Sequence, residues 1–394
     1  MVETESMSHV YQHLANELMT HKAEAYVHIG DNRDDTLRYL SAFNGPDRDY
    51  AFVFADNEAI LCVPDSFEAQ AQREFVGDKI IELQRSERTS AVNRAFEVLD
   101  MVGNVRQILI PDSTTYAVYH ELADSQYKIK TGSNLWPTRS IKTPNERKRI
   151  AAIERITESA MARAESILAS ATISENELIW KCKPLTTDRL RREINAHLAR
   201  LGVTDANNTV VGSGPSCAEL HYNGDDLIRP DRTVLIDIAP QDSGGYYGDM
   251  TRTFVPGILQ EWEREVYAIV SEALKAGLER IAEGPGIKAN SVHRRICDSI
   301  ESHGYETGDV DVGLYHGTGH GIGTRLHEPP FFSGDRYLNK GNIVTIEPGL
   351  YDPSRGGVRL EDLVVITDDG YEKVVDYPLS PTPEVRVDSI MTRC

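Results

Sequence analysis

Four acidic residues in the C-terminal half of the chain fall where the apolar pattern predicts inward-facing positions. Acidic side chains are almost never fully buried unless they are paired or coordinate a metal. We therefore expect a cation among these carboxylates. The residues and their segments are Asp237 in VLIDIAP (234–240), Asp249 in YYGDMTRTF (246–254), Glu347 in IVTIEPGLY (343–351) and Glu361 in GVRLEDLVVIT (357–367).

A glycine-rich loop between the two acidic regions supplies histidines. The loop YHGTGHGIG (315–323) carries His316 and His320, and it has too many glycines to form a helix. Four carboxylates and one imidazole are a plausible ligand set for two divalent metals. Oxygen ligands with a minority of nitrogen suit manganese, cobalt or iron. Zinc is possible, although the lack of thiolate ligands does not favour a structural zinc site.

A metal pair of this kind would perform a defined class of chemistry. Two metals about 3.5–4 Å apart need bridging carboxylates, lower the pKa of a shared water and polarise a carbonyl group. The reaction class is therefore metal-assisted hydrolysis of an amide or a related bond. An imidazole near such a site can transfer protons or hydrogen-bond an oxyanion. The histidines that lie close in sequence to the ligand segments are His221, His316 and His327.

Each acid also has a purely structural explanation. Asp237 could form an ion pair, and Asp249 could pair with Arg252. Glu361 could lie on an exposed rim beside Asp362. Together these explanations require several independent buried charges without partners, which are costly. The metal centre is therefore favoured.

The elements that must position these residues form a regular series. Each acidic pair is typical of a β-hairpin, and amphipathic helices are predicted before each hairpin. The order helices, hairpin, helices, hairpin suggests an internal duplication with both hairpins in one curved sheet. The predicted helices are 146–170, 186–202, 261–282 and 291–304, with a strand at 207–214.

An α/β unit of roughly 130 residues is predicted before this region, because strands and helices alternate there. It carries no cluster of candidate ligands. A boundary near 131–146, rich in Ser, Thr and Pro, divides the chain into domains 1–140 and 141–394. The predicted strands are 26–30, 50–55, 59–64 and 105–111, and the predicted helices are 1–21, 35–43, 68–75 and 115–124.

Composition excludes several classes of partner. The 394 residues carry a formal net charge of −19, which argues against nucleic acid and anionic membranes as partners. No apolar run approaches the ~18 residues of a membrane helix, and no signal peptide is visible. The five cysteines form no CxxC pair, and their odd number is typical of free thiols in a reducing cytosol. We therefore expect a cytoplasmic protein.

The candidate ligands resemble those of the pita-bread (M24) metallopeptidase family. There the ligands follow the order Asp, Asp, His, Glu, Glu, in motifs that this chain shows as LIDIAP…GDMTRTF, HGTGHGIG, TIEPGLY and VRLED. The match covers about residues 145–375, and it is specific because the motifs occur in the right order with compatible spacing. The resemblance implies an α/β N-terminal domain plus an α+β pita-bread catalytic domain with a curved antiparallel sheet.

The resemblance also implies the metal centre itself. Two divalent ions would be bound, with manganese or cobalt expected and zinc or iron as alternatives. Asp249 and Glu361 would bridge the ions, and Glu347 would shuttle a proton as well as bind metal. The implied ligands are Asp237, Asp249, His320, Glu347 and Glu361.

Further roles follow from the same resemblance. His221 would contact the substrate or an oxyanion, and His327 would hold the peptide near the scissile carbonyl. His316 is the third histidine expected around the substrate. Arg359, two residues before a metal-binding glutamate, would orient the site.

The aminopeptidase P and Xaa-Pro dipeptidase (prolidase) branch of the family fits this chain best. Methionine aminopeptidases usually lack a long N-terminal domain, and creatinase lacks the complete metal set. The implied reaction is hydrolysis of the bond between an N-terminal residue and a following proline. Prolidases commonly place an arginine soon after the HExP segment to bind a dipeptide's carboxylate. Here residues 329–332 are Pro-Pro-Phe-Phe, which favours an aminopeptidase acting on longer peptides.

The expected partners are small peptides with proline at the second position and, from the resemblance, a second copy of the chain in a homodimer. Two other functions stay open. In one, the same fold hydrolyses a small non-peptide amide. In the other, the protein is an inactive pita-bread binding module, although such proteins usually lose ligands and this chain keeps all of them.

Overall fold

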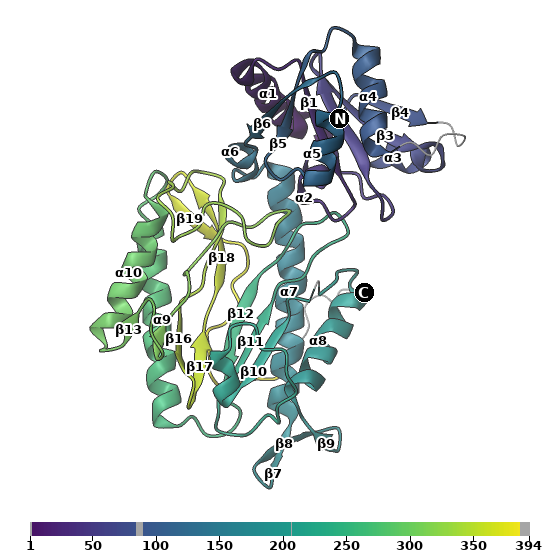
Figure 1. The fold of residues 1–394 in the computed structure, drawn as a ribbon. Helices are drawn as coiled ribbons and strands as arrows, with labels where there is room; N and C mark the ends of the chain where they lie inside the picture. The colour runs from purple at the N-terminus through teal and green to yellow at the C-terminus, as the bar shows by residue number, and fades with distance from the viewer. Residues whose placement is uncertain (1, 84–89, 206, 387–394) are drawn as a thin grey trace. The chain divides into compact units, whose positions relative to one another are not determined.

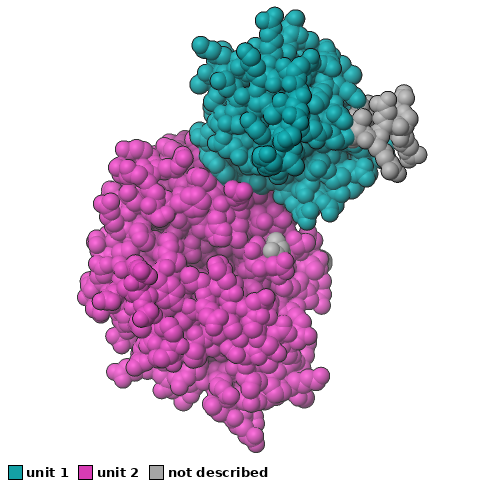
Figure 2. Space-filling view, viewed as in Figure 1, with its two compact units in different colours: residues 1–139, 143–145 teal, residues 140–142, 146–394 magenta. Residues whose placement is uncertain are grey.

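The computed structural model describes residues 2–83, 90–205 and 207–386. The chain divides into two compact units, which Figures 1 and 2 show as a ribbon and in space-filling view. Unit 1 contains residues 1–139 and 143–145, and unit 2 contains residues 140–142 and 146–394. No helix in the described ranges is long and apolar enough to cross a membrane.

Unit 1 is a mixed sheet with the strand order β4-β3-β2-β1-β5-β6 and helices on both faces. Its strands are β1 (Ala25–Gly30), β2 (Tyr50–Ala55), β3 (Glu58–Pro64), β4 (Lys79–Leu83), β5 (Gln107–Pro111) and β6 (Lys128–Ser133). Its helices are α1 (Val2–His21), α2 (Asp35–Ser41), α3 (Glu68–Glu74), α4 (Ala91–Val102), α5 (Tyr116–Ala123) and α6 (Trp136–Arg139), with a 3-10 turn at Asp65–Phe67.

Strand β2 shows why this sheet is covered on both sides. Phe52 and Phe54 belong to the apolar cluster with α1 and α2, whereas Ala51 and Val53 belong to the cluster with α4. Successive side chains of a strand point to opposite faces, so an uninterrupted apolar run needs a layer on each face. Helix α4 and strands β4 and β6 were not predicted from the sequence.

Unit 2 contains β-sheets lined by long helices. Helices α7 and α8 pack against β10, β11 and β12 in one apolar cluster, and α9 and α10 pack against β15 to β18 in another (Figure 1). The helices are α7 (Pro144–Ser170), α8 (Thr187–Arg200), α9 (Glu261–Ile281) and α10 (Ala289–Ser302), with a 3-10 turn at Gly214–Ala218.

The strands of unit 2 form hydrogen-bonded sheets in the orders β10-β11-β12, β13-β14-β16-β17, β15-β18-β19 and β7-β8-β9. They are β7 (Thr172–Ser174), β8 (Glu177–Trp180), β9 (Lys183–Pro184), β10 (Val210–Ser213), β11 (Val234–Ile238), β12 (Met250–Phe254), β13 (Glu306–Thr307), β14 (Gly313–Leu314), β15 (Ile343–Ile346), β16 (Gly349–Asp352), β17 (Gly356–Arg359), β18 (Asp362–Thr367) and β19 (Gly370–Lys373).

The second acidic hairpin is interrupted at the positions of its candidate metal ligands. Strand β15 pairs with β18 and β16 pairs with β17, so the predicted run 343–351 breaks after Ile346. Pro348 has no N–H to donate to a ladder. The register nevertheless continues across the break, because Ile346 lies opposite Asp362 and Gly349 lies opposite Arg359. The two glutamates of this hairpin therefore face each other.

The two acidic hairpins also contact each other. The backbone N–H of Glu361 donates to the carbonyl of Thr251 at 3.1 Å, and the Thr253 hydroxyl bonds the backbone of Arg359. Strand β12 therefore runs beside the β17–β18 segment, and the ligands of both hairpins reach one site.

Candidate metal centre

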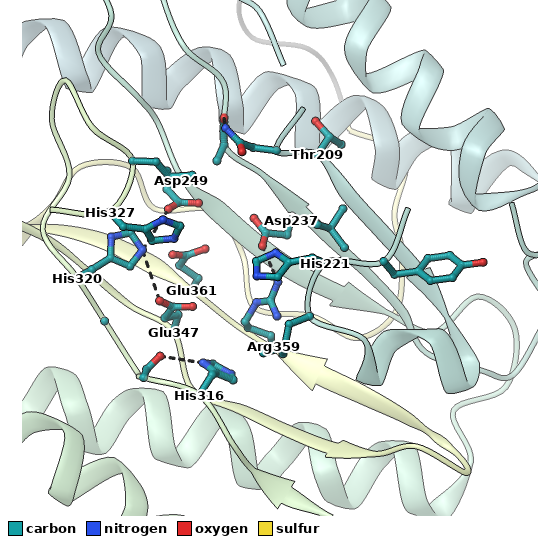
Figure 3. A pocket seen from close by; sticks show the side chains of 18 of the residues that line it. Thr209, His221, Asp237, Asp249, His316, His320, His327, Glu347, Arg359 and Glu361 are labelled. Atoms are coloured by element: carbon teal, nitrogen blue, oxygen red, sulfur yellow. Dashed lines mark hydrogen bonds and ion pairs between the residues drawn. The ribbon is translucent and has the colours of Figure 1, made fainter. Parts of the chain in front are cut away.

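The predicted ligands converge on one buried position of unit 2 (Figure 3). Ligand atoms of Asp249, His320 and Glu361 all lie within 4.8 Å of one another, and these three side chains are buried. His320 Nε2 lies 3.6 Å from Asp249 Oδ2 and 3.5 Å from Glu347 Oε1. Asp237 lines the same cavity. The structure thus brings together side chains that are up to 124 positions apart in sequence (237 to 361).

The histidine loop lies along β15, which sets the position of His320. The Thr345 N–H donates to the His320 carbonyl at 2.9 Å, and the Glu347 N–H donates to the Thr318 carbonyl at 3.1 Å. A Cβ at Gly319 would lie 2.4 Å from the Thr345 carbonyl oxygen, so a residue with a side chain could not approach β15 so closely. The glycines of this loop therefore allow His320 to reach the carboxylates.

The tautomer of His320 indicates a cation. Its Nδ1 lies 3.0 Å from the Gly321 carbonyl, which can only accept, so Nδ1 carries the proton. In the neutral ring Nε2 then presents a lone pair to two carboxylate oxygens. Burial, followed by the neighbouring His327, lowers the pKa of His320 to about 3, so this ring is neutral at physiological pH. Two ionised carboxylates repel a lone pair that faces them, and a cation between them would remove this repulsion, so the donor set fits a divalent metal.

The carboxyl groups also lie where the protein supplies too little positive charge to keep them ionised. Burial, followed by the charge of Asp237, raises the pKa of Glu361 to about 8. Burial and the charge of Glu361 also raise the pKa of both Asp249 and Glu347 well above their usual range. Carboxyl groups that resist ionisation when the protein alone surrounds them are those that a cation would stabilise.

Arg359 supplies the main positive charge of the protein at this site. Its Nη2 lies 2.5 Å from Asp237 Oδ2, and its Nη1 donates to the Tyr351 hydroxyl at 3.1 Å. Burial opposes the charge, but Tyr351, Asp237 and Glu347 together raise the pKa of Arg359. The Tyr351 hydroxyl also lies 2.8 Å from His316 Nε2. His316, Tyr351, Arg359 and Asp237 thus form one hydrogen-bonded chain.

Thr251 joins this chain to a ligand. Its buried hydroxyl donates to Glu361 Oε2 at 2.9 Å and accepts from Arg359 Nε at 3.3 Å. A hydroxyl has one proton, so these two bonds fix its orientation. Thr251 and Tyr351 were not singled out in the sequence, because a threonine and a tyrosine on strands carry no visible chemical signal.

Two of the structural explanations for single acids do not hold. Arg252 pairs with Asp362 at 2.9 Å rather than with Asp249. Glu361 is 2% exposed and does not lie on a rim. Asp237 does form an ion pair, with Arg359, and it lines the cavity at the same time.

A cavity of about 430 Å³ opens from the ligands. His221 and His327 line it, and the His327 ring packs edge-on against His320 with centroids 4.4 Å apart. His316 lines it too, and its Nδ1 donates to the Gly317 carbonyl at 2.8 Å. Part of the cavity wall was not predicted, and its residues include Asn207, Asn208, Thr209, Leu220, Tyr222 and Phe331.

Buried carboxylates and one imidazole on paired hairpins are typical of hydrolases that bind divalent metals. A family model for metallopeptidase family M24 matches residues 148–368, which is more than half of the chain. The chain belongs to this family. The resemblance expected from the motifs is thereby confirmed.

Curated relatives match the same region. The chain is 34% identical over 218 residues to the Xaa-Pro dipeptidase of Pyrococcus furiosus, which covers 53% of this chain and 60% of that protein. It is 32% identical over 262 residues to the Xaa-Pro aminopeptidase of Escherichia coli, covering 59% of this chain and 58% of that protein. The alignments thus span about three fifths of these relatives' own lengths.

The fold also matches solved structures. An Xaa-Pro dipeptidase from Bacillus anthracis superposes with a TM-score of 0.81 at 23% identity, over 94% of this chain and 98% of that one. The prolidase from Pyrococcus horikoshii gives 0.79 at 23% identity, over 94% and 99%. The predicted pita-bread fold with an N-terminal α/β domain is therefore confirmed.

Proposed function

We propose that this protein is a divalent-metal peptidase that hydrolyses the bond between an N-terminal residue and a following proline. The observation that carries the proposal is His320 Nε2, which presents a lone pair to Asp249 and Glu347 within a family of metallopeptidases. The names of the relatives, Xaa-Pro dipeptidase and Xaa-Pro aminopeptidase, supply the substrate class.

Two divalent ions would be held by Asp237, Asp249, His320, Glu347 and Glu361. Manganese or cobalt is our first choice, because oxygen ligands outnumber nitrogen, and zinc or iron would also suit the set. When bound, such ions activate a water for attack and polarise the scissile carbonyl.

The remaining residues bind and orient the substrate. Glu347 would hold and return a proton at its carboxylate, as the family resemblance implies. His221 and His327 line the cavity and would contact the peptide carbonyl. His316 would act through Tyr351, which orients Arg359 and, through it, Asp237.

The cavity favours peptides longer than a dipeptide. Among the described residues that line it, Arg359 is the one arginine or lysine, and Asp237 already pairs with it. A dipeptide places its free carboxylate close to the scissile bond and needs a cation there. The neutral wall formed by Asn207, Asn208 and Thr209 instead suits a peptide backbone that continues past the proline.

Several broader properties belong to the same proposal. The domain division is 1–140 and 141–394, close to the two compact units. A cytoplasmic location agrees with the free thiols of Cys62, Cys182, Cys217 and Cys297. The family resemblance supports a homodimer, and the net charge of −19 opposes nucleic acid and membrane partners.

One assay tests the function. Metal-free protein receives manganese, cobalt or zinc, and hydrolysis of Xaa-Pro dipeptides is compared with that of Xaa-Pro tripeptides and of matched tripeptides with alanine in place of proline. We expect metal-dependent cleavage of the proline peptides, with tripeptides cleaved faster than dipeptides. Cleavage of no proline peptide with any of the metals would contradict the proposal. Neither the non-peptide amidase nor the inactive binding module is favoured by a specific observation.

A further inference from the structure

Glu154 is a fully buried acid that the proposed reaction does not use. It lies on α7, is 0% exposed, and does not line the cavity. Its Oε2 accepts a hydrogen bond from the backbone N–H of Asp249 at 2.8 Å. Its Oε1 is buried and has no hydrogen-bond partner among the residues that the structure describes. The carboxyl group is therefore directed at a metal-ligand segment rather than at solvent.

The approach between α7 and this segment is close. A Cβ at Gly248 would lie 2.5 Å from Thr157 Oγ1 and 2.9 Å from Glu154 Oε2, so only glycine fits before Asp249. One face of helix α7 therefore packs closely against the backbone of residues 248–249 and fixes its position.

The contact with α7 matters for Asp249 because this residue lies just outside a strand. It precedes β12, whose ladder to β11 begins with Met250 opposite Ile238. The loop 239–249 leads up to it, and within that loop the Gly248 N–H donates to the Pro240 carbonyl. Outside that ladder, the hydrogen bond to Glu154 fixes the plane of the Asp249 peptide, and with it the direction of the Asp249 side chain.

We propose that Glu154 is a positioning residue for the metal centre: from helix α7 it fixes the backbone of Asp249 so that the Asp249 carboxylate meets His320 and Glu361. The inference rests on the proposed ligand role of Asp249. Groups that orient ligands from outside the coordination sphere typically change metal affinity or activity by about 10–100-fold when they are removed.

Three variants separate positioning from bulk stability. Glu154→Gln keeps an oxygen acceptor of the same reach, and Glu154→Leu removes the acceptor at similar volume. Glu165→Leu is the matched control, because Glu165 is a second fully buried acid of helix α7, and its carboxylate bonds Tyr377, Glu384 and Arg386 rather than a ligand segment. Glu154→Met serves if the leucine variant does not fold, since methionine fills the same space flexibly.

The measurement is the dissociation constant of Mn²⁺ for metal-free protein, with the urea midpoint and the kcat and KM on an Xaa-Pro tripeptide recorded in parallel. We expect Glu154→Leu, or Glu154→Met, to bind Mn²⁺ at least tenfold more weakly and to lose kcat rather than raise KM. Glu154→Gln should stay within about threefold of the wild type, and Glu165→Leu should lower the urea midpoint without changing Mn²⁺ affinity.

The outcomes distinguish this inference from the function. If the wild type binds Mn²⁺ and Glu154→Leu and Glu154→Met bind it equally well, the positioning role is wrong and the metal centre stands. Equal losses of affinity in Glu154→Gln and Glu154→Leu, or in Glu165→Leu, would also overturn it. If the wild type binds no Mn²⁺, the ligand assignment and the inference fail together.

Discussion

At the scale of single residues, the candidate ligands are held by neighbours that are not themselves candidate ligands. Thr251 bonds Glu361, Arg359 bonds Asp237, and the Gly321 carbonyl fixes the His320 ring. Each of these contacts determines which oxygen or nitrogen of a ligand points into the site. Ligand geometry therefore depends on groups of ordinary residue types.

Thr251→Val tests this dependence. The valine keeps the shape of the side chain but removes the hydroxyl that Glu361 and Arg359 share. We expect Mn²⁺ affinity and kcat to fall by about 10–100-fold, because Glu361 loses the group that orients it. Isothermal titration of the metal-free protein measures the effect. Thr253→Val is the control, since the Thr253 hydroxyl bonds the Arg359 backbone and no candidate ligand among the described residues, and an equal loss of affinity in both variants would refute a specific role for Thr251.

Single residues also show where reading the sequence succeeds and where it fails. The four acidic candidate ligands stood out because charged residues interrupt apolar strands, and His320 stood out because the family motifs follow a known order. Glu154 gives the same signal on a helix, since it lies in the inward stripe with Ile150, Ile153 and Thr157, and it could have been found the same way. Thr251 and Tyr351 could not, because their roles depend on contacts across strands that the sequence does not display.

At the scale of elements, Arg252 joins three segments of unit 2. From β12 it donates to the carbonyls of Glu361, Tyr377 and Pro378, and it pairs with Asp362 at the start of β18. The guanidinium is 1% exposed. A planar donor with this many bonds links the two acidic hairpins and the segment after β19.

Arg252→Met should destabilise the protein by about 3–5 kcal/mol, because it leaves Asp362 buried with only Lys373 as a cationic partner. Arg252→Lys keeps the charge but cannot reproduce the planar arrangement of guanidinium donors. We therefore expect a loss of stability smaller than that of Arg252→Met. Urea unfolding measures both. A change below about 0.5 kcal/mol for the methionine variant, the size of an ordinary surface substitution, would show that Arg252 does not link these elements.

In unit 1, Asp34 couples β1 to α2. It caps α2 by accepting from the Leu37 N–H at 2.7 Å, and it pairs with the buried His28 of β1 at 2.9 Å. Burial alone would raise the pKa of Asp34, but His28 and the backbone N–H of Leu37 together lower it below its usual value. A carboxyl group whose pKa is lower in the folded state stabilises the protein above the unfolded pKa, about 4, and loses that contribution as pH falls through the folded pKa.

Asp34→Ala should therefore cost about 1–3 kcal/mol at pH 7, from the lost cap and the unpaired His28. The difference from the wild type should become smaller as the pH falls below about 4, where the wild-type carboxyl also becomes protonated. Urea unfolding of both proteins at pH 7 and pH 3 measures the two differences. An equal difference at both pH values would show that the charge of Asp34 contributes nothing.

The elements themselves were predicted unevenly. The strands β2 and β3 were predicted, and Asp56-Asn57 between them adopt φ values of 52° and 62°, as a tight hairpin turn requires. Helix α4 was missed although its apolar residues recur at helical spacing, as were the short strands β4 and β6. The break in the second acidic hairpin was not predicted either, although Pro348 could have indicated it.

At the scale of the whole molecule, metal binding and folding should be coupled. The carboxylates and His320 come together only in the folded chain, so an ion that binds them stabilises the folded state by mass action. At a free metal concentration 100 times the dissociation constant, the gain is about 2.7 kcal/mol. The motifs could predict this site because they fix residue types and order, but the cavity wall around Asn207 depends on how distant segments pack.

Glu361→Gln tests the coupling. The amide keeps the size of the side chain but removes a charge that we assign to binding metal, so this variant should fold and retain little metal or activity. We expect Mn²⁺ to raise the melting temperature of the wild type and to leave that of Glu361→Gln nearly unchanged. A thermal shift of the same size in both proteins, or wild-type turnover in the variant, would refute the assignment of Glu361.

Anomalous X-ray diffraction from crystals grown with Mn²⁺ tests the central claim most directly, because it locates the ions without reference to any substrate. We predict two anomalous peaks about 3.5–4 Å apart, enclosed by Asp237, Asp249, His320, Glu347 and Glu361. A map with no peak among these side chains, at a manganese concentration that saturates binding to metal-dependent relatives, would contradict the account.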